Sequence, residues 1–209
     1  MVRAWAADIR SLLEEERYRK YYEELPAFRQ EKADRMKRKL NKAQSVGVWA
    51  LWEKIKTEYG LSQNSAFNFS HSGFWVMCAA EMEGNANVQV GCDIEQIRKA
   101  DLQMASRFFC PSEYKRILEA VCEKEEDTVF CRYWVLKESF MKATGRGMGL
   151  ALNAFEIVLD DPPRLVKKPE AFHKTYYYRE YETEGEAYRM AVCSTQEEID
   201  SKIHMEFRL

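Results

Sequence analysis

Along the chain, stretches of helical composition alternate twice with runs of strand-forming residues. From Ser11 to Tyr59 the sequence favours helices: Ser11 and Glu14 have the spacing of a capping box, and Pro26 suits a first helical turn. Gly60 predicts the end of this region. A short strand is predicted before it, over Val2–Ile9.

Three β-like runs, separated by Ser-Gly and Gly-Asn turn signals, follow Gly60 and predict an antiparallel meander. They are Ala66–Ser70, Phe74–Met82 and Val88–Glu95.

A second cycle of helices and strands fills the rest of the chain. Helices are predicted over Asp101–Phe109, Pro111–Cys122 and Glu126–Thr144, and strands over Phe155–Leu159, Thr175–Glu182, Ala187–Ser194 and Lys202–Phe207. Because helices followed by a meander occur twice, the sequence predicts an α+β fold of two halves, residues 1–98 and 99–209. Ligand sites tend to lie in the cleft between such halves.

Charge and apolar content narrow the class of protein. Lys and Arg total 32 against 34 Asp and Glu, so no overall field attracts nucleic acid or an anionic membrane. The longest apolar run, Phe74–Ala80, has seven residues, whereas a membrane-spanning helix needs about 20. Charges interrupt the stretch that a signal peptide would need, and the six cysteines form no Cys-x-x-Cys pair. We therefore expect a cytoplasmic protein with free thiols.

Two carboxylates share one face of the predicted strand 88–95. A period of two places Gly91, Asp93 and Glu95 on one side and apolar residues on the other. Neighbouring carboxylates repel each other unless a cation joins them, and Mg²⁺ prefers such hard oxygen ligands. The alternative is a solvated outer face of the strand. A metal site would need a third ligand.

That ligand could come from the predicted helix 126–144. The apolar stripe that should face the core consists of Val129, Tyr133, Leu136, Phe140 and Ala143. Glu138 and Lys142 flank this stripe and are four residues apart. They form either a surface salt bridge, which is common and weak, or an acid and a base that face one anionic ligand.

The segment Asn68–Gly73 ends the first strand of the meander. It offers hydroxyls, an imidazole and a glycine turn that lets a phosphate approach the backbone. A Ser–His hydrolase is the alternative. Adjacent strand residues point to opposite sides, so Ser70 and His71 are poorly placed as nucleophile and base, and the sequence has no Gly-x-Ser-x-Gly elbow.

A basic segment runs from Arg29 to Lys42, with seven Lys and Arg residues against Glu31 and Asp34. It is either a solvated helix face or a surface for a small anion or an acidic partner. No stacking aromatic residues are interleaved with it, which argues against nucleic acid.

Taken in order, these segments resemble the Sfp-type 4′-phosphopantetheinyl transferases from about Pro26 to Phe155. The residues that carry the resemblance are Asn-Phe-Ser-His-Ser at 68–72, Gly-Cys-Asp-Ile-Glu at 91–95, Phe-Cys-Pro-Ser-Glu at 109–113 and Trp-Val-Leu-Lys-Glu-Ser-Phe-Met-Lys-Ala-Thr-Gly at 134–145. The resemblance implies a pseudo-twofold α+β fold with coenzyme A in the cleft between the halves. It also implies transfer of 4′-phosphopantetheine from coenzyme A to a serine of an apo acyl or peptidyl carrier protein.

The resemblance further implies a role for each matching position. The Mg²⁺ ligands are Asp93, Glu95 and Glu138, and the catalytic residues are Glu138 and Lys142. The coenzyme A contacts are Arg29, Lys32, Ser70, His71 and Lys142. Relatives of this type are typically monomers, because one chain contains both halves of the cleft.

Two departures from the family pattern concern coenzyme A rather than the metal. Gln44-Ser45 stands where the family often has a basic residue before Ser or Thr, and Gly60-Leu61-Ser62 lacks the usual Gly-Lys-Pro. They concern the affinity for coenzyme A more than the chemistry. A non-catalytic protein that binds coenzyme A or a carrier on the same fold is the second hypothesis beside the transferase.

Overall fold

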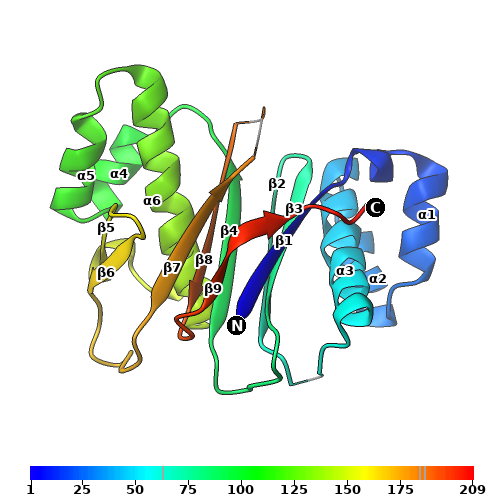
Figure 1. Cartoon of the computed structure of the whole chain (residues 1–209). Helices are drawn as coiled ribbons and strands as arrows, with labels where there is room; N and C mark the ends of the chain where they lie inside the picture. Colours follow the sequence, from blue (N-terminus) through cyan, green and yellow to red (C-terminus); the bar gives the residue numbers. More distant parts are fainter. Residues whose placement is uncertain (63, 184, 186) are drawn as a thin grey trace.

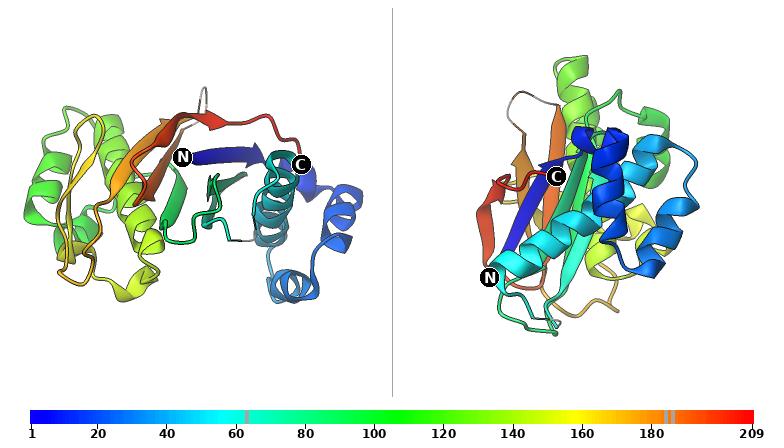
Figure 2. Two further views of the ribbon diagram at one scale, coloured as in Figure 1. Left: turned by 60° about the horizontal axis from the view of Figure 1, so that its bottom comes forward. Right: turned by 90° about the vertical axis from the view of Figure 1, so that its right-hand side faces the viewer.

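Two sheets form the centre of the protein, and helices cover the outer face of each (Figure 1, Figure 2). The computed structural model describes residues 1–62, 64–183, 185 and 187–209. The strand order is β2-β3-β1-β9 in one sheet and β4-β8-β7 in the other. The first contains β1 (Val2–Asp8), β2 (Phe67–Ser72), β3 (Trp75–Glu81) and β9 (Ile199–His204), and the second contains β4 (Val90–Gln96), β7 (Tyr177–Glu182) and β8 (Tyr188–Ser194).

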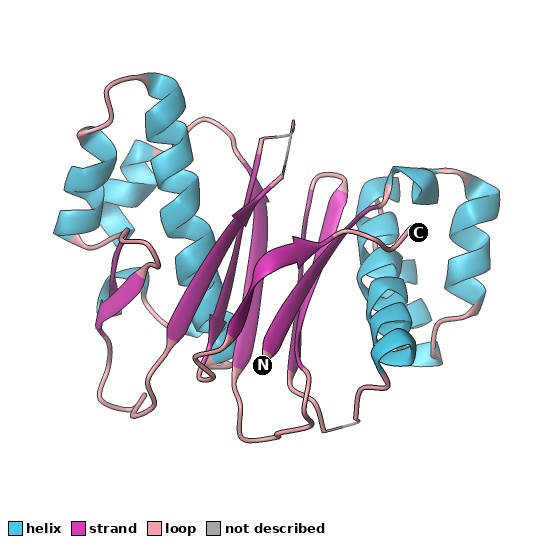
Figure 3. Cartoon of the chain, viewed as in Figure 1, coloured by secondary structure: helices cyan, strands magenta, loops and turns pink. Residues whose placement is uncertain are grey.

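The helices gather at the two ends of the molecule, outside the strands (Figure 3). Beside the first sheet lie α1 (Glu15–Glu23), α2 (Ala27–Asp34) and α3 (Lys39–Tyr59), and beside the second lie α4 (Leu102–Phe108), α5 (Pro111–Leu118) and α6 (Glu123–Ala143). A hairpin of β5 (Glu156–Val158) and β6 (Arg164–Lys167) accompanies the second group. No helix in the described part of the chain is long and apolar enough to cross a membrane.

The core follows from the alternation of side chains along the strands. On β1, Trp5 belongs to the cluster under α3, whereas Ala4 and Ala6 belong to the cluster between the two sheets. A third cluster packs α6 against the second sheet, and the whole predicted stripe of α6 from Val129 to Ala143 is buried. The predicted α+β class is therefore confirmed, as is the buried face of this helix.

The predicted three-stranded meander is wrong in its third strand. β4 pairs antiparallel with β8, from Val90 opposite Ser194 to Gln96 opposite Tyr188, so it lies in the second sheet. The reason is that β4 has two faces to bury, one between the sheets and one against α6, and both are available only there. β9 in turn joins the first sheet, parallel to β1. The pseudo-twofold relation and the division at residue 98 stay predictions.

Sequence signals predict a helix end correctly where one residue determines the backbone conformation, and they fail where a side chain is engaged in a tertiary contact instead. Gly60 ends α3 in the left-handed conformation with φ of 59°, as predicted. The Ser11 capping box is wrong, because α1 begins at Glu15 and the Ser11 hydroxyl instead donates to the carbonyl of Leu209. The strand β6 was not predicted from the sequence. All six cysteines are free thiols.

Gly91 allows α6 to lie directly on β4. A Cβ atom at this position would lie 2.0 Å from the carbonyl oxygen of Ser139 and 2.3 Å from the backbone nitrogen of Ala143. Both atoms belong to the backbone of α6, which cannot move aside as a flexible side chain can. The missing side chain therefore sets how closely the acidic face of β4 approaches α6.

We expect Gly91→Ala to destabilise the protein by about 2–3 kcal/mol, the range of overpacked cores. Urea unfolding measures the change. Gly149→Ala is the matched control, because a Cβ there meets no described atom within 4 Å. Equal stability of the two variants would contradict the close packing of α6 on β4.

Candidate active site

Side chains join the two sheets where their edge strands β2 and β4 run side by side. Asn68 Oδ1 accepts a hydrogen bond from the backbone N–H of Cys92 at 3.2 Å, and Ser72 Oγ accepts one from the N–H of Gln96 at 3.1 Å. A strand period of two puts Asn68 and Ser72 on the same face of β2. We call this line of contacts between Asn68–Ser72 and Cys92–Gln96 the seam.

The same seam connects two serines to the two predicted metal-binding carboxylates. Ser70 Oγ donates to Asp93 Oδ1 at 2.7 Å, and Ser72 Oγ donates to Glu95 Oε2 at 2.6 Å. The sequence analysis used Ser72 only as a part of the family motif and missed this contact. Alternation along β2 would have placed Ser70 and Ser72 together, but only the tertiary structure shows what they face.

Lys142 of α6 neutralises Asp93, which is 3% exposed. Its Nζ lies 2.6 Å from Asp93 Oδ1 and also donates to Ser70 Oγ at 3.0 Å and to the carbonyl of Cys92 at 3.2 Å. Burial lowers the pKa of Lys142, but Asp93 and the other acidic groups around it together raise the pKa by more, so the ammonium stays protonated. Asp93 is not on a solvated outer face, and Lys142 forms its ion pair with Asp93 instead of a surface pair with Glu138.

Glu138 and Glu95 bring two further negative charges to this point. Glu138 is half-buried, and burial raises its pKa, with the charge of Asp93 adding to the effect. Burial also raises the pKa of Glu95, while the hydrogen bond from Ser72 acts against the shift. Within the described residues, no hydrogen bond or ion pair reaches Glu138. Three carboxylates and one ammonium thus share the site, and negative charge is in excess.

These residues suit a hard cation in chemistry but do not enclose one as they stand. Asp93 Oδ2 is buried and has no hydrogen-bond partner among the described residues, although it is an oxygen that needs one. Across the described part of the chain, no three His, Cys, Asp or Glu side chains lie close enough to hold a metal ion. In their donor chemistry, the orphaned oxygen and the unpaired Glu138 fit a divalent ion.

The other side of β2 carries His71, close to two basic residues of α2. His71 is exposed, and its pKa is lowered by desolvation and by the positive charges of Lys142, Lys32 and Arg29. Lys32 is exposed on α2. Ser70 and His71 share no hydrogen bond in the described structure, and the opposite orientation predicted for them excludes a nucleophile–base pair in this arrangement.

One predicted phosphate contact, Arg29, and one residue that departs from the family pattern, Gln44, are already engaged in the fold. Arg29 is buried, its Nη2 donates to the carbonyl of Ser45 at 2.8 Å, and its guanidinium lies 5.2 Å from the centre of the Trp49 ring. Gln44, which replaces a basic residue of the family pattern, donates from Nε2 to the carbonyl of Gly73 at 2.9 Å. Ser45 Oγ is buried and lacks a partner in the described residues.

The sequence analysis also missed a fully buried ion pair next to the site. Lys137 Nζ lies 2.9 Å from Glu113 Oε2 and donates to the carbonyls of Leu152 at 2.8 Å and Phe155 at 3.0 Å. Glu113 in turn accepts backbone N–H groups from Cys110 and Ile157. Every ammonium proton of Lys137 is used, so this lysine positions α6 and takes no part in chemistry.

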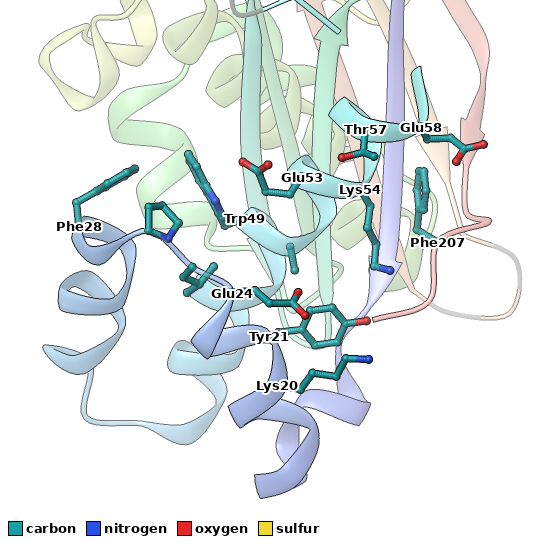
Figure 4. Close-up of a pocket in the computed structure, with 13 residues that line it drawn as sticks. Lys20, Tyr21, Glu24, Phe28, Trp49, Glu53, Lys54, Thr57, Glu58 and Phe207 are labelled. Atoms are coloured by element: carbon teal, nitrogen blue, oxygen red, sulfur yellow. The ribbon is translucent and has the colours of Figure 1, made fainter. Parts of the chain in front are cut away.

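A large groove lies away from the carboxylates. It has a volume of about 870 Å³ and runs between α1, α2 and α3, with Tyr21, Phe28, Trp49 and Phe207 in its walls (Figure 4). Its described lining holds none of the predicted site residues. A smaller cavity of about 240 Å³ adjoins Glu95 and is lined by Phe130 and Trp134. Size alone therefore does not identify the site.

Fold and site together define an α+β protein with an acidic cluster and a lysine at the junction of two sheets. The family model of the 4′-phosphopantetheinyl transferase superfamily matches residues 89–193, which include Asp93, Glu138 and Lys142. The chain belongs to this superfamily, and the resemblance to its Sfp-type members is confirmed.

Curated relatives share about a third of the aligned residues. The 4′-phosphopantetheinyl transferase Sfp of Bacillus subtilis is 36% identical over 141 residues, which cover 66% of this chain and 59% of the relative. The 4′-phosphopantetheinyl transferase gsp of Aneurinibacillus migulanus is 33% identical over 142 residues, covering 66% and 56%. The match thus spans less than two thirds of these relatives. The Thermotoga maritima holo-[acyl-carrier-protein] synthase has a TM-score of 0.44 at 19% identity, covering 53% of this chain and 64% of that one.

Removal of one partner from the Lys137–Glu113 pair should be severe. We expect Lys137→Met to cost about 3–5 kcal/mol, because it leaves the Glu113 carboxylate buried without its counter-charge. The double variant with Glu113→Gln should recover part of this loss, as measured by urea unfolding. Additive losses in the double variant would show that the two side chains do not depend on each other.

Glu138→Gln should stabilise the metal-free protein at pH 8. Because the pKa of Glu138 is raised in the folded state, folding disfavours the ionised carboxylate above that pKa, and Gln removes this penalty. Below the pKa of an unfolded glutamate, about 4.3, both states are protonated and the difference vanishes. Solvent screening keeps the gain small, so we expect a rise in Tm of about 2 °C at pH 8 and none near pH 4. A lower Tm at pH 8 would contradict the excess of negative charge.

Proposed function

We propose that this protein transfers 4′-phosphopantetheine from coenzyme A to a serine of an apo acyl or peptidyl carrier protein and releases adenosine 3′,5′-bisphosphate. Membership in the superfamily supports the reaction class. The observation that carries the proposal is the convergence of Asp93, Lys142 and Glu138 at the seam, since a buried acid–lysine cluster with an unpartnered carboxylate oxygen suits an anionic ligand and its cation.

Asp93, Glu95 and Glu138 are the residues that would hold Mg²⁺. When bound, this ion would polarise the phosphoryl oxygens and let the pyrophosphate of coenzyme A lie beside the carboxylates. The orphaned Oδ2 of Asp93 and the unpaired state of Glu138 support this assignment.

Lys142 and Glu138 carry the chemistry in this proposal. The ammonium of Lys142 lies where it can balance charge that develops on the leaving bisphosphate. The carrier serine must lose a proton as it attacks, and Glu138 accepts it. Its raised pKa brings this carboxylate closer to the working pH of a general base.

The positive charges of Lys32 and Arg29 on the far side of β2 support the binding of coenzyme A phosphates. Burial and these charges lower the pKa of His71, so its neutral imidazole would donate a hydrogen bond to a phosphate there, and Ser70 would contact the phosphates from the seam. The basic segment from Arg29 to Lys42 offers attraction for an acidic carrier domain. A monomeric, cytoplasmic enzyme completes the proposal.

The second hypothesis, a non-catalytic protein that binds coenzyme A or a carrier, has the same fold but no need for Glu138. The complete set of Asp93, Glu95, Glu138 and Lys142 favours the enzyme. A hydrolase that uses Ser70 is disfavoured, because the Ser70 hydroxyl accepts from Lys142 and donates its proton to Asp93 rather than to an imidazole.

Intact mass spectrometry of an apo carrier protein tests the proposal. Incubation with this protein, coenzyme A and Mg²⁺ should add one phosphopantetheine group, and EDTA should abolish the gain. Glu138→Gln should slow the reaction at least about 100-fold, as expected for loss of a general base. Glu123→Gln, an exposed change on the same helix, is the control with unchanged rate.

The outcomes separate the two hypotheses. Coenzyme A binding without modification of several acyl and peptidyl carriers would favour the binding protein. No binding of coenzyme A would contradict the transferase and a coenzyme A-binding protein alike.

A further inference from the structure

The two seam serines are oriented by their own hydrogen bonds. A hydroxyl has one proton to donate and two lone pairs to accept with. Ser72 Oγ accepts from the N–H of Gln96 at 3.1 Å, and its proton is directed to Glu95 Oε2 at 2.6 Å. Ser70 Oγ accepts from Lys142 Nζ at 3.0 Å, and its proton is directed to Asp93 Oδ1 at 2.7 Å. Neither hydroxyl is free to rotate away without loss of a bond.

Each carboxylate is consequently held by one oxygen and leaves the other uncommitted. On Asp93 the uncommitted oxygen is Oδ2, which is buried and has no partner in the described residues. On Glu95 it is Oε1, since the one hydrogen bond that the described structure gives this carboxylate ends on Oε2. The serines therefore divide each acid into an anchored oxygen and an available one.

The number of carboxylate oxygens available to an ion matters differently for different divalent ions. Mg²⁺ takes six ligands in near-ideal octahedral geometry and few carboxylate oxygens, whereas Ca²⁺ takes six to eight and often binds a carboxylate through both oxygens. A carboxylate with one oxygen anchored by a hydroxyl offers a single oxygen to an ion. The second oxygen becomes available only if the serine bond breaks.

We propose that Ser72 is a positioning residue that sets metal specificity: together with Ser70 it restricts Asp93 and Glu95 to one ligating oxygen each, and so favours Mg²⁺ over Ca²⁺. The inference rests on the metal site of the proposed function. Ser72 is the better test position, because Ser70 also contacts Lys142 and its loss would disturb the ammonium as well.

Equilibrium metal binding tests this role without catalysis. Bound Mn²⁺ is followed by electron paramagnetic resonance in the presence of coenzyme A, and Mg²⁺ or Ca²⁺ is titrated against it. In the wild-type protein Mg²⁺ should compete better than Ca²⁺. Ser72→Ala should reduce the ratio of Mg²⁺ to Ca²⁺ affinity about tenfold, in the range reported for groups that orient metal ligands. Ser72→Thr keeps the hydroxyl and should retain the wild-type ratio.

A purely structural role for Ser72 predicts a different result. Loss of the bond to Gln96 would then lower the Tm of Ser72→Ala and leave the affinity ratio unchanged, which overturns the proposal. Preference of the wild-type protein for Ca²⁺, or no binding of Mn²⁺, would overturn it too. Failure of carrier modification with normal metal selectivity would instead count against the proposed reaction, so the two ideas fail separately.

Discussion

The burial of Asp93 at the junction of two sheets is the constraint on which the rest of the site depends. A carboxylate that is 3% exposed needs a counter-charge and hydrogen bonds, and removal of such a group from water is costly without them. Lys142 supplies the charge from α6 and Ser70 supplies a hydroxyl from β2. Lys142 can reach Asp93 because Gly91 lets α6 lie directly on β4.

The seam explains why the segment Asn68–Ser72 alternates as it does. Asn68, Ser70 and Ser72 share the face that meets β4. Their side chains form the hydrogen bonds to β4 that backbone groups form between neighbouring strands inside one sheet. His71, between them, points to the opposite side, where the charges of Lys32 and Arg29 help to lower its pKa. One short strand therefore joins two sheets, orients two acids and presents an imidazole, which a period of two makes possible.

Much of this arrangement could be predicted from the sequence, because local periodicity governs it. The stripe of α6, the shared face of Asp93 and Glu95 and the end of α3 at Gly60 each follow from spacing or from one residue's backbone preference. The pairing of β4 could not be predicted from such local signals. β4 follows β3 in the chain but pairs with β8, since the loop between them carries it to the sheet where both of its faces are buried. The Lys137–Glu113 ion pair was not predicted for a similar reason, because the two residues lie far apart in the sequence.

Two lysines five positions apart on α6 each form an ion pair with a buried carboxylate, but one pair supports the fold and the other belongs to the candidate site. Lys137 is fully buried, and each of its three protons meets an oxygen of Glu113, Leu152 or Phe155. Lys142 also has three acceptors, but its side chain is 26% exposed, and its partner Asp93 keeps one oxygen without a bond. The first pair is closed, because any new ligand would have to break satisfied bonds in the dry core. The second pair leaves one carboxylate oxygen without a partner in the described residues and reaches solvent through Lys142, so it is the pair with which the cation and the anion of the proposed function would interact while the first holds the helix in place.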